Sequence, residues 1–135
     1  MSRQIEILLV EDSPADVRIA EEALVDAGIN VNLHVVCDGV EAVKYITHQA
    51  PYADCQAPDV VLLDLNMPRM NGHEVLEEIR NHNNMRDVPI VLLTASENSH
   101  DVEEAQRLGM NYYLRKPVEA RCLGELLSVV QTLWH

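Results

Sequence analysis

The sequence is poor in cysteine, in basic residues and in long apolar runs. Its three cysteines, Cys37, Cys55 and Cys122, are widely spaced and form no CxxC pair, so neither a disulfide framework nor a zinc site is indicated. No apolar run is long enough to span a bilayer, and residues 1–4 show no signal-peptide pattern before the first apolar run. We therefore expect a cytoplasmic protein that is not inserted in a membrane.

The charge balance limits the partners that the protein can bind. There are 22 acidic residues against 10 basic ones, which gives a formal net charge of -12. Such an excess disfavours nucleic acid and anionic membranes as partners and suits the binding of cations or basic surfaces. The length of 135 residues fits one domain. We expect a single domain over residues 1–135, with no output domain attached.

Short apolar segments alternate with helical patterns along the chain. Residues 7–10, 60–63 and 90–93 are apolar on both faces, which is typical of central strands in a parallel sheet. Residues 31–36 and 112–115 are amphipathic, as edge strands are. This pattern predicts an α/β fold with a doubly wound, five-stranded parallel sheet, strand order 2-1-3-4-5, flavodoxin-like, with helices on both faces.

Residues that can do chemistry follow the ends of these predicted strands. They are Glu11 and Asp12 after the first, Asp64 after the third, Thr94 after the fourth and Lys116 after the fifth. Because the carboxyl ends of parallel strands meet at one edge of a sheet, the ligand site of such folds lies there. The sequence therefore places three carboxylates, a hydroxyl and an ammonium around one rim.

Three carboxylates in one crevice raise one another's pKa, and a divalent cation removes that cost. Oxygen donors without histidine or thiolate select Mg²⁺, with Mn²⁺ as a second possibility. We assign Asp12 and Asp64 as metal carboxylates, with the backbone carbonyl of Asn66 as a third protein ligand. Asp64 is also the candidate nucleophile toward phosphorus, with Lys116 and the hydroxyl of Thr94 neutralising charge on the phosphoryl group.

Each of these residues has a simpler interpretation when taken alone. Acidic pairs after strands are often solvated or cap a helix, a threonine such as Thr94 often bonds to backbone, and Lys116 alone would be a surface lysine. Their joint placement at four strand ends favours one shared site. The six histidines show no metal-ligand spacing, and we interpret them as surface or edge residues.

At these positions the chain resembles the receiver domain of bacterial two-component response regulators. The matching segments are LVEDS at residues 9–13, LLDLNMP at 62–68, Gly72, LTA at 93–95 and the Lys116-Pro117 pair. The resemblance covers essentially the whole chain. It implies that a sensor histidine kinase donates a phosphoryl group to Asp64.

The resemblance also implies roles for the neighbouring residues. Glu11 and Asp12 would serve Mg²⁺. Thr94 and Tyr113 would form a switch that, together with Lys116, reads out the phosphoryl group; Tyr113 is chosen because it lies three residues before Lys116. The protein would then signal by protein-protein contact.

A narrower resemblance concerns the partner. The segments SPADV at 13–17, PYAD at 51–54 and KPV at 116–118 look more like the small, stand-alone regulators that accompany bacterial phytochrome kinases. A phytochrome is therefore the expected kinase partner. Many receivers carry phenylalanine where this chain has Val118, which concerns local packing only.

Three other functions compete with this one. A Mg²⁺-dependent small-molecule phosphatase would use an aspartyl-phosphate and a second acid two residues after the nucleophile, where this chain has Asn66. A nucleotide- or flavin-binding domain would have a glycine-rich or basic loop at residues 11–16, which here are acidic. A docking module without phosphorylation would have lost part of the acid, hydroxyl and lysine set. We expect a signalling phosphoacceptor rather than an enzyme.

The end of the chain predicts a homodimer. A lone receiver can transmit its signal only through its surface, and two-fold dimers are common. The expected interface is formed by the helix at residues 99–108, the edge strand at 112–115 and the last helix. That last helix has more apolar residues than one buried stripe requires, so Val129 or Trp134 is expected to face a partner, although Trp134 could equally pack in the core.

Overall fold

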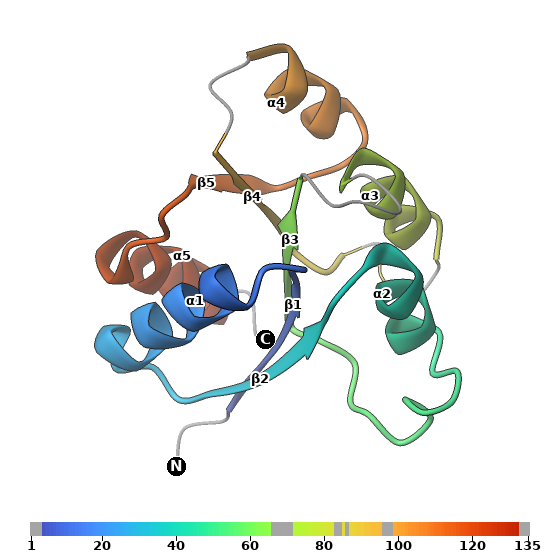
Figure 1. Cartoon of the computed structure of the whole chain (residues 1–135), viewed down its shortest axis with the longest axis horizontal. Coiled ribbons are helices and arrows are strands. Elements are labelled where there is room, and N and C mark those ends of the chain that lie inside the picture. Colours follow the sequence, from blue (N-terminus) through green and yellow to red (C-terminus); the bar gives the residue numbers. More distant parts are fainter. Residues whose placement is uncertain (1–3, 66–71, 83–84, 86, 96–98, 133–135) are drawn as a thin grey trace.

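Five parallel strands form one sheet with the predicted order. The computed structural model describes residues 4–65, 72–82, 85, 87–95 and 99–132. Its strands are β1 (Ile5–Val10), β2 (Val31–Val36), β3 (Val60–Asp64), β4 (Ile90–Thr94) and β5 (Tyr112–Arg115). They pair in the order β2-β1-β3-β4-β5 (Figure 1). The amphipathic segments are the two edge strands, which confirms the prediction from the sequence.

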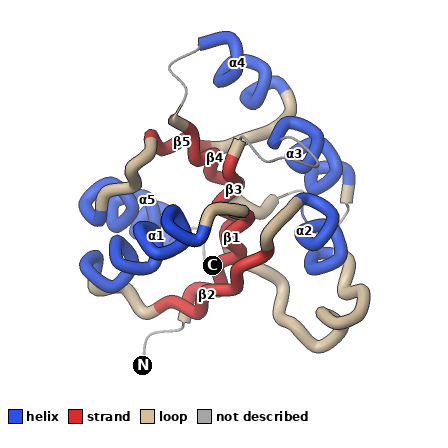
Figure 2. The backbone as a smooth tube through the Cα atoms, viewed as in Figure 1, coloured by secondary structure: helices blue, strands red, loops and turns tan. Residues whose placement is uncertain are grey.

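Helices cover both faces of the sheet (Figure 2). The helices are α1 (Pro14–Ala27), α2 (Gly39–Ile46), α3 (Gly72–Asn81), α4 (Ser99–Arg107) and α5 (Ala120–Thr132). One apolar cluster joins α1 and α5 to the sheet, and a second joins α2, α3 and α4 to its opposite face. No described helix combines the length and the apolarity needed to cross a membrane.

The alternation of side chains along β1 explains why its sequence is apolar throughout. Ile5, Ile7 and Leu9 pack in the cluster beneath α1 and α5, whereas Leu8 and Val10 pack on the opposite face. Because helices cover both faces of a parallel sheet, a central strand has no polar face. The same reasoning applies to β3 and β4, whose residues are all buried.

The register of the strands brings distant residues to one edge of the sheet. Val10 lies opposite Leu63 in the β1–β3 pair, so the residues that follow β1 lie beside the end of β3. In the β4–β5 pair, Thr94 lies opposite Arg115, and the backbone N–H of Lys116 donates to the carbonyl of Thr94 at 2.9 Å. The Lys116–Pro117 peptide bond is cis.

Helix α1 begins immediately beyond this edge. Ser13 is its N-cap, and the side chain of Ser13 accepts a hydrogen bond from the backbone N–H of Asp16 at 3.3 Å. Pro14 occupies the first helical position, where a missing N–H has no cost. The helix ends at Gly28, whose φ of 70° is in the left-handed region.

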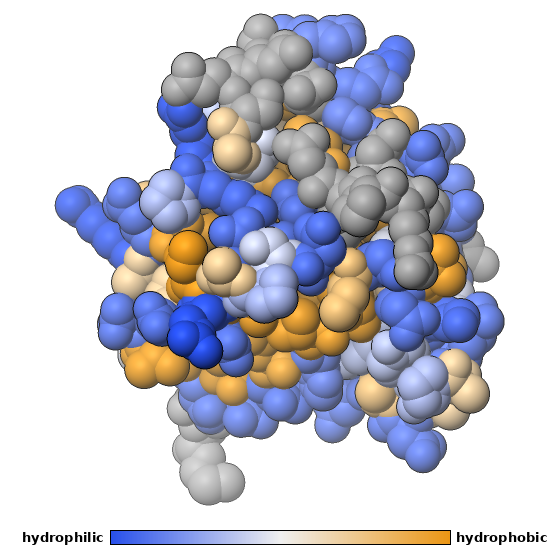
Figure 3. Space-filling view, viewed as in Figure 1, coloured by the Kyte–Doolittle hydropathy of each residue, from blue (hydrophilic) through white to orange (hydrophobic). Residues whose placement is uncertain are grey.

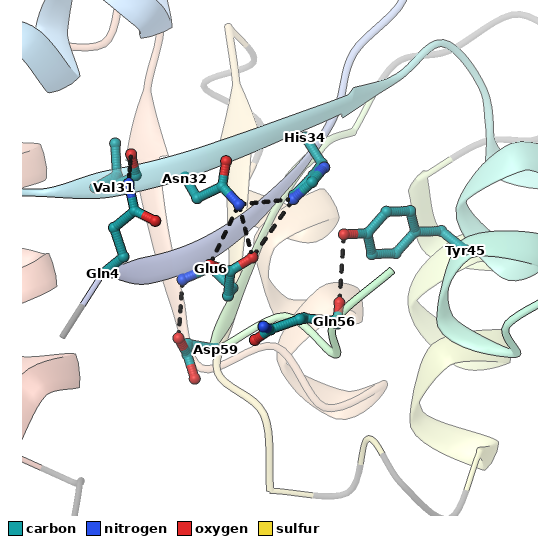
Figure 4. A network of polar contacts seen from close by, with 8 residues as sticks. All are labelled: Gln4, Glu6, Val31, Asn32, His34, Tyr45, Gln56 and Asp59. Carbon is teal, nitrogen blue, oxygen red and sulfur yellow. Dashed lines mark hydrogen bonds and ion pairs between the residues drawn. The ribbon is translucent and has the colours of Figure 1, made fainter. Parts of the chain in front are cut away.

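A polar cluster lies toward the opposite end of β1 and β2 (Figure 4). The buried carboxylate of Glu6 accepts hydrogen bonds from the side-chain amide of Asn32 at 3.0 and 3.3 Å, and Nε2 of His34 lies 3.4 Å from it. The backbone N–H of Glu6 donates to Asp59 at 2.8 Å. The first strand predicted from the sequence begins at residue 7. Glu6 lies outside that run, so the sequence does not identify this cluster.

Arg80 joins three segments near the amino ends of β4 and β5. Its guanidinium donates to the carbonyl of Gly109 at 2.8 Å, to the carbonyl of Met85 at 2.6 Å and to the side-chain oxygen of Asn111. That same oxygen accepts from the backbone N–H of Ile90 at 2.8 Å. A Cβ at Gly109 would lie 2.9 Å from Cγ of Arg80, and the φ of 107° there also favours glycine.

The surface carries several exposed apolar side chains. Figure 3 shows apolar surface across the middle of one face and hydrophilic surface around it. On the elements predicted to form a dimer, Tyr113 of β5 is 47% exposed and Val129 of α5 is 44% exposed. Trp134 lies outside the described residues. Val129 is thus at the surface, and the partner contact predicted for Val129 or Trp134 stays a prediction.

Candidate functional site

Three carboxylates converge at the carboxyl ends of β1 and β3. Glu11, Asp12 and Asp64 each offer an oxygen within 4.8 Å of the others. Glu11 and Asp64 are buried, at 2% and 4% exposed, whereas Asp12 is exposed. The backbone N–H of Ser13 donates to Glu11 at 3.3 Å and so ties this carboxylate to the start of α1. The residues thus lie together, as the strand ends predict.

The ammonium of Lys116 lies against this acidic cluster. It donates to Glu11 at 2.7 Å and to Asp16 at 2.9 Å, and it lies 3.3 Å from Oδ1 of Asp64. An ammonium has three N–H donors, and here three carboxylates surround it. The β5–α5 connection therefore supplies the positive charge that partly offsets the acids from β1 and β3.

The charges in this cluster perturb one another. Burial raises the pKa of Glu11 to about 7; the neighbouring Asp64 adds to the rise, and the ammonium of Lys116 opposes it. Burial alone would lower the pKa of Lys116, but its hydrogen bonds to Glu11 and Asp16 outweigh that effect and raise the pKa above its usual range. Burial thus disfavours the ionised form of Glu11, and the ammonium of Lys116 only partly offsets that effect.

The donor set fits a divalent cation. All three converging groups are carboxylates, the hard oxygen donors that Mg²⁺, Mn²⁺ and Ca²⁺ prefer. A cation would favour the ionised form of Glu11, whose pKa is raised first by burial and then by the neighbouring Asp64. Asn66, the predicted carbonyl ligand, lies outside the described residues.

Thr94 and Tyr113 occupy different environments near the cluster. Thr94 ends β4 and is 1% exposed, and its backbone carbonyl accepts from the N–H of Lys116. Tyr113 lies two positions earlier along the sheet, opposite Leu92, and is largely exposed. The aromatic ring is therefore on the surface in this structure, and the hydroxyl residue is inside.

The site contains one acid that the sequence does not predict as part of it. Asp16 appears in the sequence as an ordinary first-turn acid of α1, yet its carboxylate bonds to Lys116, 100 residues away in the chain. The available signal is its position one turn after the strand-end acids. That position places Asp16 near the rim, but it does not predict the bond to Lys116.

This arrangement suits phosphoryl transfer. A buried carboxylate beside an ammonium and cation-binding oxygens can attack phosphorus, because transfer depends mainly on positioning and on neutralising the charge of the phosphoryl oxygens. The same oxygens could also hold a cation without any transfer. The comparisons with known proteins distinguish these possibilities.

The comparisons are consistent over nearly the whole chain. Residues 7–128 match the response regulator receiver domain family. The response regulator Rcp1 of Synechocystis is 37% identical over 128 residues, which cover 95% of this chain and 87% of that protein. They give no support to the phosphatase alternative.

Two solved structures extend this likeness. The phosphorylated cyanobacterial phytochrome response regulator RcpA has a TM-score of 0.82 and 34% identity, covering 98% of this chain and 94% of its own. The Mn²⁺-bound form of Rcp1 has a TM-score of 0.78 and 36% identity, covering 96% and 94%. Receiver domains bind a divalent metal in an acidic pocket and take their phosphoryl group from histidine kinases. The chain therefore belongs to the response regulator receiver domains, the two-component signalling modules that accept a phosphoryl group on an aspartate.

Proposed function

We propose that Asp64 is the phosphoacceptor and that Mg²⁺ is the metal of this receiver. The observation that carries the proposal is the buried Asp64 carboxylate, which lies 3.3 Å from the Lys116 ammonium and converges with Glu11 and Asp12. Glu11, Asp12, Asp64 and the carbonyl of Asn66 would hold Mg²⁺. When bound, the metal supplies positive charge to the phosphoryl oxygens.

The protein's own side chains account for the rest of the chemistry. A carboxylate oxygen of Asp64 forms a bond to phosphorus while the P–N bond of the kinase phosphohistidine breaks, and the electron pair leaves with the imidazole. Lys116 neutralises one phosphoryl oxygen, and the hydroxyl of Thr94 donates to another. The protein thus assists its own phosphorylation and dephosphorylation, without turnover of a small substrate.

Phosphorylation would be read out by Thr94 and Tyr113. The phosphoryl group is a strong acceptor, so Thr94 moves to bond it, and the vacated space admits the ring of Tyr113. The exposure of Tyr113 in this structure supports the proposal, because a ring that starts at the surface could then turn inward.

The kinase partner that we propose is a phytochrome histidine kinase in the cytoplasm. The likeness to Rcp1 and RcpA supports the choice of kinase. The three free cysteines, of which Cys37 and Cys122 are exposed, suit a reducing compartment. Phosphotransfer from a phytochrome kinase should be faster than from a chemotaxis kinase, and equal rates would argue against this pairing.

The output surface that we propose is a homodimer through α4, β5 and α5. Its support is the edge position of β5 and the exposure of Tyr113 and Val129 on neighbouring elements. Sedimentation at micromolar concentration should show a dimer that Val129→Glu or Trp134→Ala weakens. Val25→Glu, at an exposed position of α1, is the matched control. A strict monomer with and without beryllofluoride would contradict the dimer.

The phosphoacceptor is tested by mass spectrometry. Incubation with acetyl phosphate and Mg²⁺ should add the mass of one phosphoryl group, and Asp64→Asn should abolish this addition. Asp26→Asn, which removes one acid from the exposed face of α1, is the charge-matched control. Labelling that persists in Asp64→Asn, or that proceeds equally in EDTA, would exclude the assignment.

The switch is tested separately. Thr94→Ala should still accept the phosphoryl group but lose the downstream response. Beryllofluoride should shift the amide NMR signals of Thr94 and Tyr113 in the wild type. Unchanged signals at both residues would rule out this switch.

A further inference from the structure

Asp16 has no role in the reaction as described so far, yet it bonds to the central cation of the site. Its Oδ2 lies 2.9 Å from Nζ of Lys116, closer than the 3.3 Å that separates Lys116 from Asp64. The Asp16 side chain is 37% exposed, whereas that of Lys116 is 16% exposed. Asp16 is thus the more exposed partner of the ammonium, whereas the side chains of Glu11 and Asp64 are buried.

The local fold leaves the Asp16 carboxylate available for this bond. The cap of α1 uses the backbone N–H of Asp16, which donates to Ser13, and it does not need the side chain. The carboxylate of Asp16 is therefore not part of the cap, although an acid in the first turn also interacts favourably with the helix dipole. Substitution of the side chain leaves the hydrogen bond of the cap in place.

The three acids around Lys116 differ in what else they can bind. Glu11 and Asp64 belong to the group whose oxygens lie close enough to share a cation. Among the described residues, Asp16 is not part of that group. A bound dication competes with Lys116 for Glu11 and Asp64, because each carboxylate would then face two positive groups. Asp16 faces no such competition.

We propose that Asp16 is the positioning residue of Lys116: its carboxylate anchors the ammonium beside Asp64 while Glu11 and Asp64 turn toward the cation. The proposal rests on the roles given above to Lys116 and Asp64. Two charge-assisted bonds hold the lysine in the metal-free protein, to Glu11 and Asp16, and the bond to Asp16 survives cation binding. Lys116 then remains in reach of the incoming phosphoryl group.

The lysine itself provides a direct readout. Lys44 and Lys116 are the two lysines of the chain, and Lys44 pairs with Glu41 on the surface at 3.6 Å. The side-chain ammonium signals in ¹⁵N NMR are therefore assigned by one Lys44→Arg variant. In the wild type, the Lys116 signal should stay protected from solvent exchange both in EDTA and with Mg²⁺.

The decisive variant is Asp16→Asn. With Mg²⁺, its Lys116 ammonium should exchange about tenfold faster than in the wild type, whereas in EDTA Glu11 should still retain it. Glu22→Gln, a charge-matched change on the exposed face of α1, should alter neither signal. If Asp16 only stabilised the helix, Asp16→Asn would lower the melting temperature without any Mg²⁺-dependent effect on Lys116. Equal exchange in Asp16→Asn and wild type at saturating Mg²⁺ would overturn the proposal.

A kinetic measurement completes the test. Phosphorylation by acetyl phosphate should slow by roughly tenfold in Asp16→Asn, and Asp16→Glu should recover part of the loss. An unchanged rate would overturn the role of Asp16 in the reaction. If the wild type itself takes no phosphoryl group on Asp64, the proposed function fails, while the ammonium signals still decide whether Asp16 anchors Lys116.

Discussion

Charged side chains are buried at both ends of the sheet, but different kinds of partner satisfy them. Toward the amino ends, Glu6 accepts from the amide of Asn32 (Figure 4). Arg80, near the same end, donates to backbone carbonyls. At the carboxyl ends, the acids of the site surround the ammonium of Lys116. At the amino end the partners are mainly dipoles, with Nε2 of His34 also 3.4 Å from Glu6, whereas at the carboxyl end they are opposite charges.

This difference separates a structural end from a reactive end. The carbonyls that accept from Arg80 belong to the backbone, so these bonds tie chain segments to one another. Charged partners at the rim can be exchanged, because a cation can replace an ammonium and a phosphoryl group can replace a carboxylate. We therefore expect the carboxyl end to respond to ligands without any change at the amino end.

The largest expected effect is at the charge-paired end. Lys116→Met should lower the free energy of unfolding in EDTA by about 3 kcal/mol, because the acids lose their buried partner. Added Mg²⁺ should restore more stability to this variant than to the wild type. Lys44→Met, which removes an exposed lysine, is the control. Urea unfolding in EDTA and in Mg²⁺ measures the loss of stability and its recovery. If Lys116→Met lost the same free energy of unfolding in EDTA and in Mg²⁺, the distinction between the two ends would be removed.

A smaller loss is expected at the dipolar end. Arg80→Met should lower the free energy of unfolding by about 2 kcal/mol, because the carbonyls of Gly109 and Met85 lose a donor. The loss should be the same in EDTA and in Mg²⁺, and phosphorylation should be unaffected. Arg107→Met, at an exposed position of α4, is the matched control. A Mg²⁺-dependent loss in Arg80→Met would show that the ends are coupled.

The pH dependence of stability should report Glu11. Its folded pKa of about 7 lies above the ordinary value of 4.5, so between these values the folded protein keeps a proton that the unfolded chain releases. This contribution to stability is full below pH 4.5 and is lost as the pH rises through about 7. In EDTA, the free energy of unfolding of Glu11→Gln minus that of the wild type should therefore rise with pH. Between about pH 5 and pH 8 this difference should increase by more than about 1 kcal/mol. A constant difference between the two proteins would contradict the raised pKa.

The smallest effect is expected for Glu6→Gln. The new amide oxygen can still accept from Asn32, so the free energy of unfolding should fall by about 1 kcal/mol or less. Phosphorylation by acetyl phosphate should keep its wild-type rate. A slower rate in this variant would show that the amino end takes part in the reaction. That result would contradict the assignment of the reaction to the carboxyl end alone.

The sequence predicts the sheet well because central and edge strands differ in their patterns. A central strand is buried on two faces and is apolar throughout, whereas an edge strand is amphipathic. The apolar runs that lead to Asp64 and Thr94 identify the central strands, and the strand order follows. The meeting of Glu11, Asp12 and Asp64 follows from that order. The roles of these residues, and of Asn66 and Tyr113, remain predictions.

The features that the sequence does not predict depend on contacts across the fold. Glu6 is buried because Asn32 lies opposite it in the β1–β2 register, and no pattern within β1 indicates this. The bond between Asp16 and Lys116 joins a helix turn to a loop, and neither residue type nor local spacing identifies a partner so far along the chain. Arg80 likewise looks like an ordinary residue in the last turn of α3.

The ion pair between Lys116 and Glu11 spans 105 positions, and that separation has a consequence for how the chain folds. β1 and β3 can pair and bring Glu11 beside Asp64 well before β5 is added. Long-range pairing in parallel sheets is slow, because the intervening chain must first be ordered. We expect partly folded chains to carry the full repulsion of the acids, and β5 to deliver the charge that relieves it. A reactive site would thus appear only in chains whose last strand has docked.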